Sequence, residues 1–177
     1  MNVNAPQESL MRKGMSIGTW MALLWTLSFL SSMLGRGTLL GTLSLPLGLF
    51  SLYYIARVVA REAIEQKPPL LVRIIALTLW SFFFCALLTT FFQAVYLATI
   101  DQGVFANELK KAMELVVNTQ GMDPQLKAQM EQIPVMMSNL STSTQLLLTQ
   151  NLLMGITFAL FTAPGSYFIA KKLKDKA

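Results

Sequence analysis

The chain has 177 residues, of which 54% are hydrophobic and only 13% are charged, and its formal net charge is +5. Soluble domains carry roughly 25% charged residues, so this composition, with its apolar residues in long runs, excludes a soluble globular core. It indicates a single integral membrane domain over residues 1–177. The chain has no histidine, the commonest metal ligand, and its single cysteine, Cys85, excludes an intramolecular disulfide.

Four apolar runs are each long enough to cross a membrane. A spanning helix needs roughly 20 mostly apolar residues, and every run reaches that length without an ionisable side chain. The sequence therefore predicts an all-α integral membrane fold, a bundle of four transmembrane helices. We expect these helices at about residues 14–35, 37–57, 73–100 and 144–170, with Arg57 as the charged flank at the end of the second apolar run and Arg73 as the one at the start of the third.

The distribution of lysine and arginine predicts the orientation of these spans. Ten of the fourteen cations lie before the first span, between the second and third, or after the fourth. Because cytoplasmic flanks carry an excess of lysine and arginine, we expect both termini in the cytoplasm. The positive charge is explained in this way by topology, and we expect no nucleic-acid partner.

Small residues predict where the helices pack, because they let backbones approach in lipid, where apolar side chains alone give helices no reason to associate. The second span has the clearest stripe of this kind. The expected packing residues are Gly37, Gly41, Ser44, Gly48 and Ser51 in the second span, Gly155 and Ala159 in the fourth, and Gly14, Gly18 and Ala22 in the first. We favour packing of the four helices within one bundle, because each has a face of small residues that another helix can cover. The alternative is a homo-oligomer formed through the stripe of the second span.

Two prolines, Pro46 and Pro164, lie inside predicted spans. Each removes a backbone hydrogen bond and predicts a helix kink. Broken helices line substrate sites in transporters, but no charged residue accompanies either break here. We therefore interpret both prolines as shaping the helices.

Residues 101–143 form the only sizeable segment outside the predicted spans. Apolar residues recur at helical spacing within 104–116 and again within 126–137, and Gly121 and Asp123–Pro124 separate the two stretches. The pattern predicts an outward amphipathic helical hairpin. Such a hairpin rests on the membrane surface, on the bundle or on a partner.

Five polar residues lie near the outer ends of the spans: Arg36, Gln93, Asp101, Gln150 and Asn151. We expect interhelical hydrogen bonds of about 1 kcal/mol or less each, with a small polar pocket as the alternative. The apolar runs hold no Asp, Glu, Lys or Arg, which argues against a coupled transporter. No catalytic set, cofactor site or metal site can be assembled, so we do not expect an enzyme.

A series of short motifs extends over essentially the whole chain: Leu45–Pro46–Leu47, Tyr53–Tyr54–Ile55–Ala56–Arg57, Ala86–Leu87–Leu88, Ile100–Asp101–Gln102–Gly103 and Ala163–Pro164–Gly165. In this order they resemble the bacterial membrane proteins of family 4199 in the domain-of-unknown-function series. Ala60–Arg61 stands where members of that family often have a Tyr–Arg pair. The resemblance implies an uncharacterised four-span protein of the bacterial inner membrane with both termini inside, and it implies no activity.

The leading functional hypothesis is a non-enzymatic scaffold or accessory subunit that acts through the outer hairpin and the small-residue faces. Its expected partners are the lipid bilayer and either a second copy of itself or another membrane protein. The alternative is a small carrier or channel for a neutral or apolar solute or lipid, built on the two proline breaks and the polar pair Gln93 and Asn151. A cavity between the helices would favour this alternative.

Overall fold

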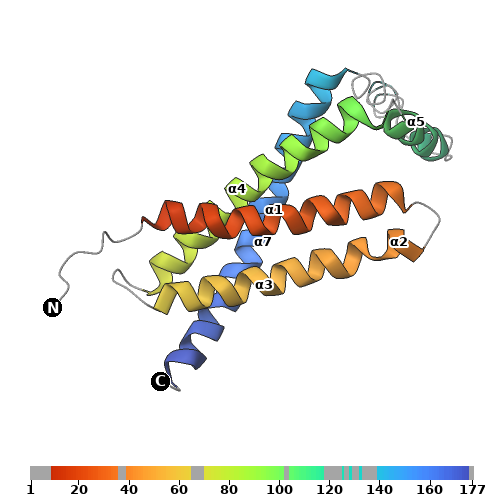
Figure 1. The fold of residues 1–177 in the computed structure, drawn as a ribbon. Helices are drawn as coiled ribbons and strands as arrows, with labels where there is room; N and C mark the ends of the chain where they lie inside the picture. Colours follow the sequence, from red (N-terminus) through yellow and green to blue (C-terminus); the bar gives the residue numbers. More distant parts are fainter. Residues whose placement is uncertain are drawn as a thin grey trace. The chain divides into compact units, whose positions relative to one another are not determined.

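The computed structural model describes residues 9–35, 39–64, 70–101, 104–117 and 139–175, with isolated positions 125, 128 and 132. Every regular element among these residues is helical, so the predicted all-α class is confirmed for them. The helices are α1 (Leu10–Leu34), α2 (Leu39–Thr42), α3 (Ser44–Ile64), α4 (Leu70–Thr99), α5 (Val104–Val117) and α7 (Leu140–Lys174), shown in Figure 1. By length and composition α1, α4 and α7 can each cross a membrane, as expected of a multi-pass membrane protein.

The chain divides into two compact units. The first contains Met1–Thr89 and Gln150–Ala177, and the second contains Thr90–Thr149. Helices α4 and α7 each contribute to both units, while α1, α2 and α3 belong wholly to the first. The prediction of one membrane domain over residues 1–177 stays a prediction.

The predicted second span is the element that differs most from the structure. The helix over residues 37–57 is not continuous, because α2 ends at Thr42 and α3 begins at Ser44 after a turn at Leu43. Pro46 explains the break, since it has no N–H for the Thr42 carbonyl and its ring crowds that oxygen. Ser44 lies at the restart, where its hydroxyl donates a hydrogen bond to the Gly41 carbonyl at 2.9 Å.

The end of this span also lies elsewhere than predicted. Helix α3 does not stop near Arg57 but continues to Ile64. The buried stripe of Ile55, Val59 and Ala63 repeats every four residues past the arginine, which itself stays exposed. An amphipathic face therefore carries the helix beyond its apolar run, and α3 is not among the three helices that qualify as spans by composition.

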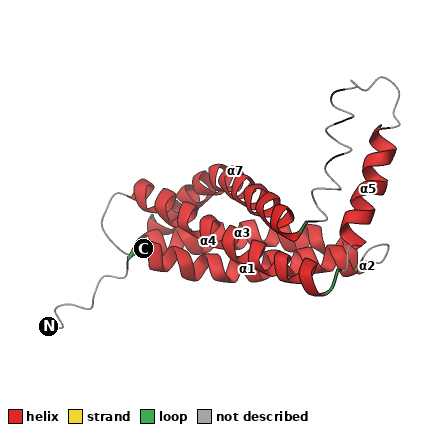
Figure 2. Ribbon diagram, turned by 90° about the horizontal axis from the view of Figure 1, so that it is seen from above, coloured by secondary structure: helices red, strands yellow, loops and turns green. Residues whose placement is uncertain are grey.

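Helices α1 and α3 lie side by side (Figures 1 and 2), and the colours of Figure 1 show that they are antiparallel. Polar contacts along their length fix the register, because residues that come later in α1 pair with residues that come earlier in α3. They are the Lys13–Glu62 ion pair, the Trp25 Nε1 to Ser51 Oγ hydrogen bond of 2.9 Å, and the Ser28 Oγ to Ser44 carbonyl hydrogen bond of 2.8 Å.

The closest helix crossing joins α1 to α4 at two glycines. A Cβ added at Gly18 would lie 2.5 Å from the Ser81 carbonyl oxygen, and one at Gly14 would lie 2.5 Å from Cβ of Trp80. No side chain fits at either position without moving the other helix. Because Gly14 meets Trp80 and Gly18 meets Phe84 and Ser81, the two helices run in the same direction.

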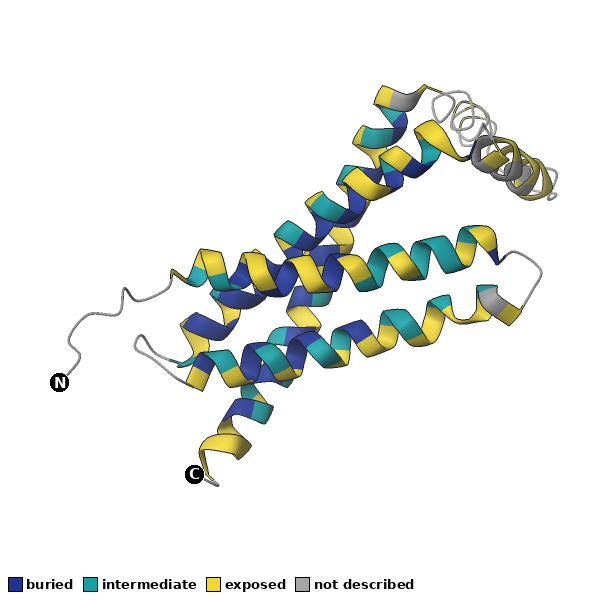
Figure 3. Ribbon diagram, viewed as in Figure 1, coloured by how far each residue is buried: buried dark blue, intermediate teal, exposed yellow. Residues whose placement is uncertain are grey.

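Helix α7 packs on α4 within the first unit through Gly155. A Cβ there would meet Cβ of Phe82 at 3.5 Å, an ordinary van der Waals distance. An aromatic cluster lies at the same level, with ring centroids of Trp25 and Phe158 5.8 Å apart and those of Phe82 and Phe158 6.4 Å apart. The buried residues of α1, α3, α4 and α7 form one core around this cluster (Figure 3).

The second unit contains α5 and the beginning of α7. Asp101 precedes α5, and its carbonyl accepts a hydrogen bond from the Val104 N–H at 2.9 Å. Asn139 caps α7, since its side-chain oxygen accepts from the Ser141 N–H at 3.0 Å. The first helix of the predicted hairpin is present, and its second half lies almost wholly outside the described residues.

The glycine crossing predicts opposite effects for one substitution at two positions. Gly18→Ala should lower the free energy of unfolding by roughly 1–3 kcal/mol, because its methyl group would overlap the α4 backbone. Gly48→Ala is the matched control, since nothing lies within 4 Å of a Cβ there, and it should leave stability unchanged or raise it by up to about 1 kcal/mol. Thermal unfolding of the purified proteins in mild detergent measures both. Equal melting temperatures for the two variants would contradict the crossing.

Candidate functional site

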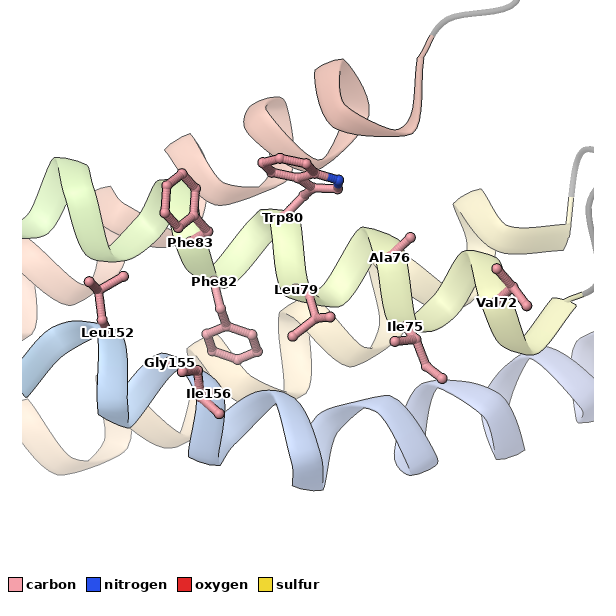
Figure 4. Close-up of a pocket in the computed structure, with 10 residues that line it drawn as sticks. All are labelled: Val72, Ile75, Ala76, Leu79, Trp80, Phe82, Phe83, Leu152, Gly155 and Ile156. Carbon is pink, nitrogen blue, oxygen red and sulfur yellow. The ribbon is translucent and has the colours of Figure 1, made fainter.

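An apolar groove runs between α4 and α7 in the first unit. Its upper part has a volume of about 690 Å³, and Figure 4 shows Phe82, Leu79 and Ile75 extending from α4 toward α7. The side chains that line this part are almost entirely apolar: Val72, Ile75, Ala76, Leu79, Trp80, Phe82 and Phe83 from α4, and Leu152, Gly155 and Ile156 from α7.

The groove continues along α7 toward Phe168, while on α4 this part overlaps the first and runs from Leu71 to Leu79. This lower part has a volume of about 470 Å³ and shares Ile75, Leu79 and Ile156 with the upper part. It ends where Leu71 of α4 faces Phe168 of α7. Because the beginning of α4 meets the end of α7 here, the two helices are antiparallel.

Small residues on α7 create the space. Ala159 and Ala163 line the lower groove, where larger side chains would close the gap between the helices. Pro164 also lines it, and α7 continues through this residue although its missing N–H leaves the Leu160 carbonyl without the usual helical partner. The proline predicted as a helix kink therefore lies in the wall of the groove.

A second apolar groove, of about 680 Å³, lies between α1 and the break that precedes α3. Pro46 lines it together with Leu34 and Phe50, so the second predicted kink also borders a cavity. Both prolines thus adjoin open space with a largely apolar lining.

The predicted packing stripe of the second span is only partly used inside the first unit. Ser51 is buried and bonded to Trp25, whereas Gly41 and Ser44 are half-buried. A Cβ at Gly48 would have nothing within 4 Å, so its packing role stays a prediction. The close approach occurs at Gly14 and Gly18 of the first span, and Gly37 lies outside the described residues.

The two packing residues predicted for the fourth span lie in the buried part of α7. Gly155 and Ala159 are buried, and Gly155 faces Phe82 of α4. These two residues also border the groove, so the same positions permit the helix contact and leave the space beside it.

The five residues of the predicted polar pocket are distributed over both units. Gln93 and Asp101 are buried in the second unit, while Asn151 is buried and Gln150 exposed in the first. Arg36 lies outside the described residues. The polar pocket therefore stays a prediction, and the apolar groove is a site that the sequence analysis did not find.

Comparison with known proteins adds no second source for the fold or the site. No protein-family model matches the chain, and no curated protein or solved structure matches it. The resemblance to family 4199 therefore rests on the sequence motifs alone.

Arg73 is a residue whose environment the sequence analysis missed. The sequence predicts a charge that flanks the third apolar run, but α4 begins at Leu70 and Arg73 is fully buried within its first turns. Its Nη1 donates a hydrogen bond to the Ala63 carbonyl near the end of α3 at 3.3 Å. A cation at a helix C-terminus satisfies carbonyls that have no partner within the helix and opposes their negative partial charge. The two prolines before Leu70 in the sequence were the available signal that a helix starts ahead of the arginine.

Truncation of this arginine should destabilise the first unit. Arg73→Ala removes a buried charged donor from the end of α3 and should lower the free energy of unfolding by roughly 2–4 kcal/mol. Arg61→Ala removes the same side chain from an exposed position on α3 and should change it by less than about 0.5 kcal/mol. Thermal unfolding in detergent gives the difference, and equal effects of the two truncations would rule out the buried cap.

Proposed function

We propose that this protein is a non-enzymatic protein of the bacterial inner membrane that holds the apolar part of a lipid or of a neutral solute in the groove between α4 and α7. The groove carries the proposal. Ligand sites have volumes of about 300–1,000 Å³, and the upper part alone, at about 690 Å³, falls in that range. The groove is open along its side and its walls are apolar, so in a bilayer a hydrocarbon chain fits it better than water does.

The exposure of the groove walls supports entry from the side. Ile75, Leu79 and Ile156 are 43%, 48% and 54% exposed, although all three line the space between the helices. In a bilayer, such walls face hydrocarbon rather than water. A guest of acyl-chain character would therefore reach the groove laterally, without crossing an aqueous phase.

We further propose four spans with both termini in the cytoplasm, α3 serving as the second span. The helix directions support this, since α1 and α4 run one way and α3 and α7 run the other. The beginnings of α1 and α4 and the ends of α3 and α7 then share one end of the first unit. The described cations of this unit lie at that end, as cytoplasmic flanks require: Arg12, Lys13, Arg57, Arg61, Arg73, Lys171, Lys172 and Lys174.

The single cysteine makes the topology directly testable. In a Cys85→Ser background, Ser9→Cys should be labelled by a membrane-impermeant maleimide only after the cells are lysed. Asn107→Cys, an exposed position on α5, should be labelled in intact spheroplasts. Labelling of both positions from the same side would contradict an odd number of spans between them.

Filling the groove should displace its guest. Ala163→Phe places a ring in the lower groove, whereas Leu153→Phe adds aromatic bulk on an exposed part of α7 that does not line it. Native mass spectrometry of gently extracted protein should show a retained lipid or apolar molecule on the wild-type chain and on Leu153→Phe. The occupied fraction of Ala163→Phe should be at least about fivefold lower, and an unchanged fraction would reject the proposed function.

The accessory-subunit hypothesis is the second candidate, and α5 favours it. This helix exposes Val104 and Val116 together with charged residues, as an interaction helix outside the membrane would. The same mass spectra separate the two functions. A chain that retains no apolar guest and is recovered with a stoichiometric protein subunit would replace the first candidate by the second.

A further inference from the structure

The groove-facing residues of α7 form a continuous stripe that runs directly into the lysines of its last turns. Tyr167 and Phe168 line the inner end of the groove. Lys171 follows Tyr167 by four residues and Phe168 by three, and Lys172 follows Phe168 by four. Residues three and four apart are neighbours on one face of a helix, so these two lysines lie next to the residues that line the inner end of the groove.

Both lysines are exposed and available to a ligand. Each is exposed at the end of α7, where Lys174 adds a third positive charge and Asp175 one negative charge. The inner end of the groove is thus an apolar channel that terminates at a cluster of positive charge. An apolar surface followed by positive charge fits an amphiphile with a hydrocarbon chain and an anionic headgroup.

Building on the proposed function, we infer that the occupant of the groove is an anionic phospholipid. One acyl chain lies between α4 and α7, and the phosphate group lies at Lys171 and Lys172. No covalent step is involved. A zwitterionic phospholipid would fill the groove equally well but would gain less from the lysines, because its net charge is zero.

The length of the groove agrees with this occupant. It extends along α7 from Leu152 to Phe168, a distance of about 24 Å at a rise of 1.5 Å per residue. The hydrocarbon core of a bilayer is roughly 30 Å thick and is shared by two leaflets, so the groove is longer than the acyl layer of one leaflet. It can therefore take a whole acyl chain that starts at the inner interface. The lysines lie one helical turn beyond its end, at the level of the lipid headgroups.

The orientation of the protein alone does not require this placement of charge. Arg57 and Arg61 are also exposed at the same end of the first unit, but they belong to α3, which lines neither part of the groove. A general attraction to the anionic inner leaflet would act through all four cations alike. A bound lipid acts through Lys171 and Lys172 in particular, and the two arginines therefore supply a matched control.

The test titrates the purified full-length protein with phosphatidylglycerol and, separately, with phosphatidylcholine of identical acyl chains. Native mass spectrometry measures the apparent Kd of the first bound lipid in each case. Each cation near an anionic surface strengthens binding several-fold, so the wild-type chain should prefer phosphatidylglycerol by roughly tenfold. The Lys171→Gln/Lys172→Gln variant should lose this preference, the Lys171→Arg/Lys172→Arg variant should keep it, and so should Arg57→Gln/Arg61→Gln.

The outcomes distinguish the anionic-lipid site from the proposed function of the groove as a site for an apolar ligand. Equal affinity of the wild-type chain for both lipids, or an equal loss of preference in the lysine and arginine double variants, would overturn the anionic-lipid site. The proposed function would still stand in that case if Ala163→Phe weakened the binding of both lipids. If Ala163→Phe left both affinities unchanged, the groove would not be the binding site and both proposals would fail. A lipid-free dimer would show that a second copy covers the groove and would also overturn the inference.

Discussion

The backbones of α1 and α4 meet at Gly14 and Gly18, where even a methyl group would lie 2.5 Å from atoms of the other helix. In lipid the hydrophobic effect does not drive helices together, so association depends on close packing of this kind and on hydrogen bonds between helices. The crossing fixes one face of α4 against α1. With α3 held on α1 by the Trp25–Ser51 hydrogen bond and the Lys13–Glu62 ion pair, the opposite face of α4 is left for α7.

The contact of α4 with α7 is of a different kind. Gly155 approaches Phe82 at ordinary van der Waals distance, and the rings of Trp25, Phe82 and Phe158 join three helices at that level. On both sides of this contact, the small residues of α7 leave apolar space that no side chain fills. The groove is therefore a consequence of one tight crossing and one looser contact on opposite faces of the same helix.

The charged residues of the first unit also divide into those that pack between helices and those that stay exposed. Lys13, Glu62 and Arg73 are used within the first unit, where they join α1 to α3 and close the end of α3. Lys171 and Lys172 remain exposed beside the groove. In the sequence all of these residues look alike, as charges that flank apolar runs. Only their position on each helix face separates structural charges from those available to a ligand.

Composition and run length depend on local residues alone, and they were enough to predict the helical class, the long apolar helices α1, α4 and α7 and the concentration of cations near particular helix ends. The sequence placed α1, α4 and α7 within a few residues of their observed ends. It misjudged α3, because Pro46 separates α2 from α3 where only a kink in one helix was expected. The buried stripe beyond Arg57 was also missed, since it matters only when a neighbouring helix covers it. It also favoured Gly48 over Gly14 and Gly18 as a packing residue, because identical small residues differ only in what faces them. The groove could not be predicted from the sequence, because it forms only where the surfaces of α4 and α7 meet. Neither helix indicates it when its residues are considered separately.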